Sequence, residues 1–155
     1  DSPNYPLLAA GFKREKILTY APGMTNISIS YNLRSTKAQI TATIYRYKKK
    51  EGAGSNLSTQ FKAEKKQIER LHPGAKLLAE DSVTLVKNGH NYPALKVSYR
   101  FIEAFMNRRQ EIYSELLLWR YEDNYIKLRS TCPFAQKKTA GRKNIELLNT
   151  VNWAN

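Results

Sequence analysis

Hydrophobic and polar residues alternate along the first third of the chain with the two-residue period of a β-strand. Residues 27–34 alternate isoleucine, tyrosine and leucine with serine, asparagine and arginine, and residues 40–45 alternate isoleucine and alanine with threonine and tyrosine. Because successive side chains of a strand point to opposite faces, each segment is predicted to be a strand with one buried and one wet face. Residues 12–20 precede a proline–glycine turn signal and are predicted to form a strand before these two.

The pattern changes over residues 58–72, where β-branched residues give way to lysine, glutamate, glutamine and alanine. Phe61, Ile68 and Leu71 lie at helical spacing in this segment and predict a narrow apolar stripe on one side of a helix. Ser58 is expected to cap the start of that helix, and the following proline and glycine are expected to end it.

Four further strands are predicted after this helix, at residues 77–86, 95–101, 112–121 and 125–131. The middle of the segment 112–121 is apolar at consecutive positions, so both of its faces are expected to be buried. That strand is therefore predicted to lie in the interior of the sheet.

The last element is a second helix, predicted over residues 136–153. Its buried side is expected to carry Ile145, Leu148 and Val151. The complete order is then β-β-β-α-β-β-β-β-α, in which runs of consecutive strands favour a largely antiparallel sheet covered by the two helices. The predicted fold class is α+β, with an extended lead-in over residues 1–11 and a single domain over residues 12–155.

Lysine and arginine outnumber aspartate and glutamate by 26 to 13, which gives the 155-residue chain a formal net charge of +13. This surplus favours an acidic protein or an anionic surface as partner, although it is also typical of a well-solvated surface. The basic residues form one positive surface if the two helices share a face of the sheet, and a diffuse field if they lie on opposite faces. The candidate partner-binding residues are Lys48, Lys49, Lys50, Lys62, Lys65, Lys66, Arg70, Lys137, Lys138, Arg142 and Lys143.

Nucleic-acid binding needs aromatic residues interleaved with basic ones on one exposed face. Residues 45–48 and 119–121 come closest to that pattern. Both segments lie in predicted strands, where such aromatics usually pack on the core or pair across strands. Nucleic acid is therefore a possible but less favoured partner.

Residues suited to catalysis or metal binding are few. His72 and His90 are the only two histidines and lack partners at metal-ligand spacing, so neither a metal nor a cofactor is expected. Cys132 precedes a proline at a strand end and is expected to be a buried thiol rather than a nucleophile. No catalytic residue is predicted. An enzyme would gain support from a histidine within hydrogen-bond reach of Cys132 or of a carboxylate in a concave pocket.

The start of the chain and its cysteine content bear on location. The sequence begins at Asp1 rather than at methionine, which a removed signal segment would explain as well as a trimmed start. One cysteine makes no internal disulfide and suits the cytoplasm or a bacterial periplasm. No run approaches the roughly 20 apolar residues that span a bilayer. The expectation is an exported, periplasmic protein without a transmembrane segment, and its oligomeric state stays open.

Three strand segments carry a family resemblance: residues 27–31 (ISISY), 42–47 (ATIYRY) and 125–133 (YIKLRSTCP). With the element order, they resemble the sandwich fold shared by the photosystem II extrinsic protein PsbP, the Mog-type Ran-binding proteins and the bacterial DcrB-like envelope proteins. The resemblance covers residues 12–153. It implies an exported adaptor or interaction protein of the cell envelope and supplies no active-site residue.

These observations lead to one hypothesis and one alternative. The hypothesis is a non-enzymatic, exported binding or adaptor protein that presents a basic surface to an acidic partner. The alternative is a protein that binds anionic lipid or nucleic acid, mainly through phosphate contacts.

Overall fold

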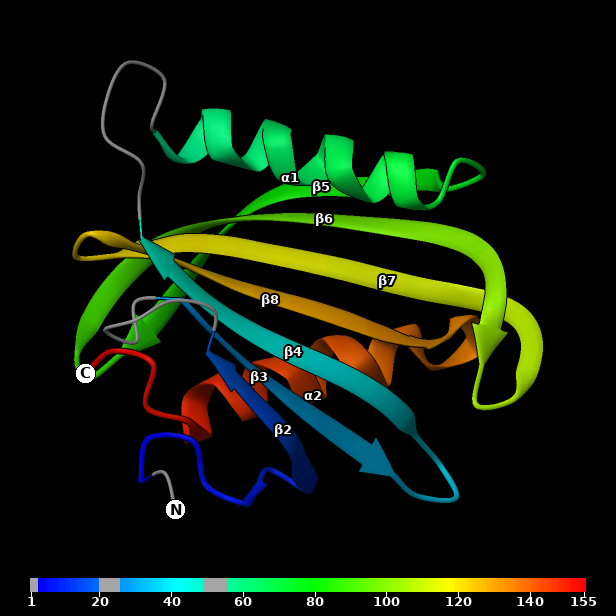
Figure 1. The fold of residues 1–155 in the computed structure, drawn as a ribbon, viewed down its shortest axis with the longest axis horizontal. Helices are drawn as coiled ribbons and strands as arrows, with labels where there is room; N and C mark the ends of the chain where they lie inside the picture. The colour runs from blue at the N-terminus through cyan, green and yellow to red at the C-terminus, as the bar shows by residue number, and fades with distance from the viewer. Residues whose placement is uncertain (1–2, 20–25, 49–55) are drawn as a thin grey trace.

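The computed structural model describes residues 3–19, 26–48 and 56–155. These residues form one antiparallel sheet of eight strands in the order β1-β2-β3-β4-β8-β7-β6-β5, together with two α-helices (Figure 1). The strands are β1 (Leu8–Ala9), β2 (Phe12–Thr19), β3 (Ile27–Arg34), β4 (Gln39–Lys48), β5 (Lys76–Lys87), β6 (His90–Phe105), β7 (Arg108–Tyr121) and β8 (Asn124–Pro133). The helices are α1 (Leu57–Leu71), the 3₁₀ turn η1 (Phe134–Gln136) and α2 (Lys137–Thr150).

The α+β class and the antiparallel sheet are confirmed, but the element order is not fully as predicted. The additional strand β1 lies in the expected lead-in and pairs Leu8 with Lys13 and Ala9 with Phe12. Tyr5 and Ala9 are both buried in the core. A strand of two residues is too short to show an alternating hydrophobic pattern. It forms because it pairs with β2.

Strand β7 lies between β8 and β6 and is buried on both faces, as its apolar middle predicts. Leu116 and Leu118 belong to one hydrophobic cluster, whereas Leu117 and Trp119 belong to the other. All four side chains are at most 1% exposed. The two cores of the molecule therefore meet across this strand.

The helices cover opposite faces of the sheet (Figure 1). Phe61 and Ile68 of α1 pack in the same cluster as Leu118, whereas Leu147 and Leu148 of α2 pack in the cluster that contains Trp119. Since neighbouring residues of a strand point to opposite faces, the two clusters lie on the two sides of the sheet. The basic residues of α1 and α2 consequently cannot form one continuous surface.

Helix α1 differs from its prediction at both ends. It begins at Leu57, and the side chain of Asn56 rather than of Ser58 caps it, accepting a hydrogen bond of 2.8 Å from the Thr59 backbone N–H. Leu71, predicted to be buried, is 64% exposed, because the last turn of the helix overhangs a surface hollow instead of the core. The buried side of the helix carries Glu64 between its two apolar residues.

Helix α2 also differs from its prediction. Ile145 is 39% exposed, and Asn144 takes the buried position beside it. The helix ends at Thr150 rather than at residue 153, because the Asn152 backbone N–H donates to the Asn4 carbonyl oxygen at 2.7 Å. This bond draws the end of the chain onto the N-terminal segment, a contact that no local sequence pattern encodes.

The position of β7 leads to a first prediction. Leu118→Ala is expected to lower the free energy of unfolding by about 2–5 kcal/mol, because a fully buried leucine in a two-sided core leaves a cavity when truncated. Urea unfolding monitored by tryptophan fluorescence measures this loss. Val86→Ala is the matched control: Val86 is 60% exposed on the edge strand β5, so a change within about 0.5 kcal/mol is expected. A loss below about 1 kcal/mol for Leu118→Ala would contradict the structure.

Candidate functional site: a basic stripe and a polar cleft on helix α1

Three of the predicted partner-binding residues form a basic stripe on the outer side of α1. Lys62, Lys66 and Arg70 are four residues apart and all exposed, so they follow one another along the same side of the helix. Within the described ranges, no carboxylate oxygen lies at ion-pair distance from any of the three. The stripe is therefore exposed and has no ion-pair partner among residues 3–19, 26–48 and 56–155.

Lys65 does not belong to this stripe. Its Nζ lies 2.6 Å from Glu80 Oε1 on β5 and 5.1 Å from the centre of the Phe61 ring. The side chain is thus drawn down toward the sheet, and its charge is largely compensated by Glu80.

The predicted basic residues of α2 lie on the other side of the molecule. Lys137 and Lys138 are exposed, and Lys137 packs against the Phe134 ring with its Nζ 4.7 Å from the ring centre. Arg142 and Lys143 both bind Glu146, at 3.2 Å and 2.7 Å. The α2 surface is therefore less positive than its sequence suggests. Lys49 and Lys50 lie outside the described residues.

A polar cleft of about 380 Å³ separates α1 from the ends of β4 and β8. It brings together Lys48 and Arg70, two predicted site residues that are 22 positions apart in the sequence. Arg70 also belongs to the basic stripe, so the stripe and this opening are continuous. The α1 cleft is lined by Tyr47, Lys48, Gln60, Ala63, Glu64, Gln67, Arg70 and Tyr125.

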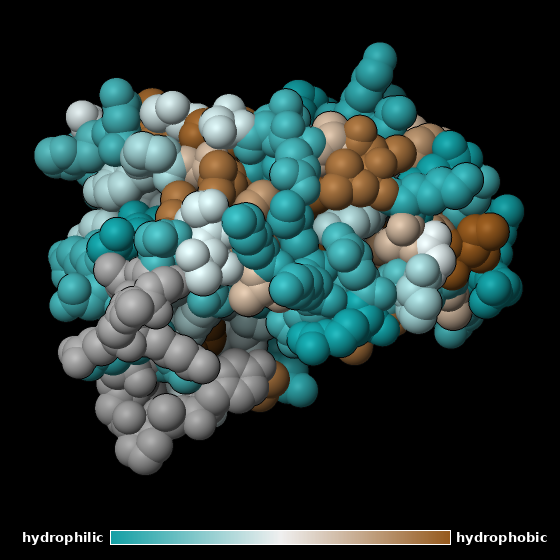
Figure 2. All heavy atoms as spheres, turned by 90° about the horizontal axis from the view of Figure 1, so that it is seen from above, coloured by the Kyte–Doolittle hydropathy of each residue, from teal (hydrophilic) through white to brown (hydrophobic). Residues whose placement is uncertain are grey.

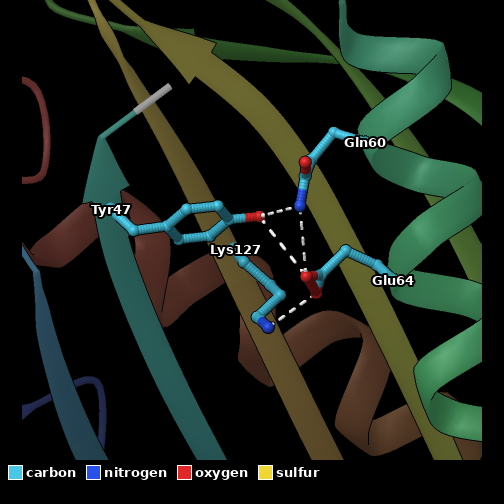
Figure 3. A network of polar contacts seen from close by, with 4 residues as sticks. All are labelled: Tyr47, Gln60, Glu64 and Lys127. Carbon is cyan, nitrogen blue, oxygen red and sulfur yellow. Dashed lines mark hydrogen bonds and ion pairs between the residues drawn. The ribbon is translucent and has the colours of Figure 1, made fainter. Parts of the chain in front are cut away.

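Tyr47, Gln60 and Glu64 line the α1 cleft and form a network with Lys127, in which the four polar side chains point toward one another (Figure 3). Lys127 Nζ lies 2.6 Å from Glu64 Oε2, and the two side chains are only 13% and 10% exposed. Tyr47 donates to Glu64 Oε1 at 3.4 Å. Gln60 Nε2 donates to the Tyr47 hydroxyl oxygen at 3.1 Å and approaches Glu64 Oε1 at 3.4 Å. The helix is thereby joined to β4 and β8 through one buried carboxylate.

Burial controls the protonation of this network. It raises the pKa of Tyr47 well above its usual value of 10, and the negative charge of Glu64 raises it further, so Tyr47 keeps its proton and acts as a donor. Burial also lowers the pKa of Lys127, while the adjacent Glu64 opposes that shift. The cleft thus combines hydroxyl, amide and cationic groups with the Glu64 carboxylate.

The sequence analysis did not identify Glu64 and Lys127 as site residues. Glu64 was detectable, because an acidic residue lies between Phe61 and Ile68 at helical spacing on the buried side. Lys127 was harder to identify from the sequence, since it alternates with apolar residues in β8 like an ordinary solvent-facing lysine. Only the packing of α1 over β8 buries it.

The aromatic residues weighed for nucleic-acid stacking are engaged inside the fold. Trp119 is fully buried. Tyr45 and Tyr47 both lie beside Lys127, with its Nζ 4.4 Å and 5.7 Å from the two ring centres. Arg46 packs on the ring of Tyr121 instead.

A second hollow, of about 420 Å³, lies at the C-terminal end of α1 and holds a histidine–carboxylate pair. His72 Nδ1 is 2.7 Å from Glu103 Oε2, and the imidazole stacks on Phe101 with 4.2 Å between ring centres. This geometry meets the condition stated for an enzyme, but its lining contains no serine, threonine or cysteine nucleophile. Cys132 is buried, and burial raises the pKa of its thiol to about 12.

Apolar side chains border the same hollow. Leu71 and Ile102 are 64% and 58% exposed and both line it, with Arg109 at its edge. Figure 2, which views the molecule from the α1 side, shows such apolar surface between the charged residues. The basic stripe therefore leads from the α1 cleft toward a partly apolar surface.

Within residues 3–19, 26–48 and 56–155, no group of three or more histidine, cysteine, aspartate or glutamate side chains is placed to hold a metal ion. None of the described helices has the length and apolar character needed to cross a membrane.

No protein-family model matches this chain, and no curated protein is similar to it in sequence.

Proposed function

We propose that this protein is a non-enzymatic binding or adaptor protein that docks an acidic partner on the α1 side. The observation that carries the proposal is the basic stripe: Lys62, Lys66 and Arg70 are exposed, aligned and unpaired within the described part of the chain. The pairs that other basic residues make, such as Lys65 with Glu80, show that carboxylates elsewhere in the fold do compensate cations. An uncompensated stripe attracts negative charge and speeds association with it.

The α1 cleft supports the same proposal. Lys48 and Arg70 stand at an opening that Tyr47, Gln60 and Gln67 also line, and the Glu64 carboxylate there is already paired with Lys127. An acidic side chain bound there can satisfy charge and hydrogen bonds together, which gives more specificity than an exposed stripe alone.

An anionic lipid surface is the second candidate function. It is favoured by the exposed Leu71 and Ile102, which lie beside Arg109 and within the reach of the basic stripe. Peripheral proteins bind anionic membranes through this combination of apolar and basic side chains. Nucleic acid remains the less favoured form of this alternative.

The proposal extends to location and fold family. An eight-stranded antiparallel sheet with a helix on each face supports the likeness to the PsbP, Mog and DcrB-like sandwich. By that likeness we place the protein outside the cytoplasm, in a bacterial periplasm or envelope. Fold likeness alone assigns no partner.

Reversal of the basic stripe tests the function. The triple variant Lys62→Glu, Lys66→Glu and Arg70→Glu is expected to bind a polyglutamate peptide at least about tenfold more weakly, because attraction becomes repulsion at all three positions. The control triple Lys137→Glu, Lys138→Glu and Arg142→Glu carries the same charge change on the opposite face and is expected to stay within about threefold of wild type. Circular dichroism checks that both variants fold. Equal losses in the two triples would refute docking on the α1 side.

Two further titrations separate the partner classes. Vesicles with and without phosphatidylserine test the lipid alternative, and duplex DNA tests the nucleic-acid one. Nucleic-acid binding weakens linearly in log–log plots as salt rises, with a slope that reports the number of phosphate contacts. If DNA or anionic vesicles bind more tightly than polyglutamate at physiological salt, the acidic-protein proposal is wrong.

A further inference from the structure

Two adjoining hollows at the C-terminal end of α1 share an apolar lining. Leu71, Phe101 and Ile102 line the hollow of about 420 Å³. Phe101 and Ile102 also line a neighbouring hollow of about 370 Å³, together with Leu78. Leu71, Leu78 and Ile102 are all exposed, and a group of exposed apolar side chains, unlike a single one, marks an interaction surface. We call the two hollows together the apolar recess.

The charges around the apolar recess leave a positive surplus. Glu103 and Glu111 are the two carboxylates of its lining, and each already contacts a basic side chain. Lys76 and Arg109 also line it and are exposed. Among the described residues, no carboxylate oxygen lies at ion-pair distance from either cation. The recess therefore combines an apolar surface with cations that are available to an acidic ligand.

The apolar recess begins where the basic stripe ends. Leu71 directly follows Arg70, the last residue of the stripe. With a rise of about 1.5 Å per residue, Lys62 and Arg70 are roughly 12 Å apart along the helix axis. An extended segment crosses that length with about four residues. A segment that lies along the stripe thus reaches the recess with its next side chain.

We propose that the apolar recess receives a large apolar side chain of the acidic partner, next to the acidic residues that contact the basic stripe. This inference rests on the proposed function and specifies its partner as an acidic segment with an adjoining residue such as leucine. A recess admits single side chains, whereas a membrane is contacted by apolar side chains that project from the protein, so the shape favours a peptide. Lys76 and Arg109 attract carboxylates that flank the apolar side chain.

Titrations with three capped peptides test the inference. All three carry six consecutive glutamates: one ends in leucine, one begins with leucine and one ends in serine. Isothermal titration calorimetry at low ionic strength, where exposed charges are least screened, measures each Kd. One leucine peptide is expected to bind at least about fivefold more tightly than the serine peptide, because its side chain leaves water for an apolar surface. The favoured position of the leucine gives the direction of the bound segment.

Variants locate the origin of this preference. In Leu71→Ser with Ile102→Ser, the leucine and serine peptides are expected to bind within about twofold of each other. Both side chains are exposed, so the fold should persist, and circular dichroism checks it. Leu71→Ala alone is expected to lower the preference at least about twofold, so the test stands even if the double variant fails to fold.

A second pair of exposed apolar residues provides the matched control. Val86 and Ile145 line a different hollow, of about 510 Å³, between the end of β5 and α2. Val86→Ser with Ile145→Ser is therefore expected to keep the full preference for leucine. Loss of the preference in this control as well would overturn the inference, because apolar surface in general would then explain the gain.

The remaining outcomes separate this inference from the proposed function. If the serine peptide binds and leucine at either end adds less than about twofold, the inference is wrong while the proposed function stands. If none of the three peptides binds, both are wrong. If Leu71→Ser with Ile102→Ser weakens binding to phosphatidylserine vesicles more than binding to the leucine peptide, the recess serves a membrane and the inference is again wrong.

Discussion

Glu64→Gln is expected to lower the free energy of unfolding by about 3–5 kcal/mol, because it breaks a buried ion pair while keeping the shape of the side chain. Lys127 would keep its charge at 13% exposure with no carboxylate near it. The same substitution removes the attraction between the Glu64 carboxylate and Arg129. Urea unfolding monitored by circular dichroism measures the loss.

A double-mutant cycle provides the control for this prediction. In the Glu64→Gln background, Lys127→Met removes the orphaned charge and is expected to recover a large part of the lost stability. Tyr47→Phe removes only a neutral hydroxyl from the same network and is expected to cost about 0.5–1.5 kcal/mol. If Glu64→Gln costs no more than Tyr47→Phe, the ion pair does not hold α1 to the sheet.

Trp153→Ala is the other change with a large expected effect, about 3–5 kcal/mol in the free energy of unfolding. Trp153 is 1% exposed although only two residues follow it in the sequence. Its ring meets those of Trp119 and Tyr92 at 5.2 Å and 5.0 Å, and its Nε1 donates to the Leu148 carbonyl oxygen at 3.1 Å. Removing the indole would open a cavity and leave that carbonyl with Lys87 Nζ, at 3.3 Å, as its remaining side-chain donor.

Asn155, two positions after Trp153, provides the control. Deletion of Asn155, which is exposed, should change the free energy of unfolding by less than about 0.5 kcal/mol. The loss of unfolding free energy for Trp153→Phe should lie between those for the Asn155 deletion and Trp153→Ala, because the phenylalanine keeps an aromatic ring but loses the hydrogen-bond donor. Comparable stability of wild type and Trp153→Ala would show that the chain end is not part of the core.

The longer strands were predictable because their periodicity follows from their own burial. Ile40, Ala42 and Ile44 are buried as their alternation indicates, since each strand places every second residue on the core side. The run at residues 116–119 likewise indicated a strand with two buried faces, and β7 has them. The helical hydrophobic pattern was wrong where a polar residue takes a core position. Leu71 and Ile145 were predicted to be buried but are exposed, while Glu64 and Asn144 are buried.

The candidate site was predictable only as a set of charges. Lysine and arginine positions are visible in the sequence, but their pairing partners come from distant strands: Glu80 compensates Lys65 across 15 residues, and Glu64 compensates Lys127 across 63. The stripe of Lys62, Lys66 and Arg70 stands out only after those pairs are removed. Pairing depends on which elements pack together, so charge counting by segment could not separate free cations from paired ones.

The sequence by itself determined that this is a strongly basic α+β protein with a largely antiparallel sheet and two helices, because net charge and hydrophobic period are local properties of a chain. The tertiary structure alone decided that the helices lie on opposite faces of the sheet, which divides the basic residues into two surfaces. It also decided that Glu64 and Lys127 pair beneath α1. Burial and pairing of charge arise only when distant segments pack, and no local pattern reports them.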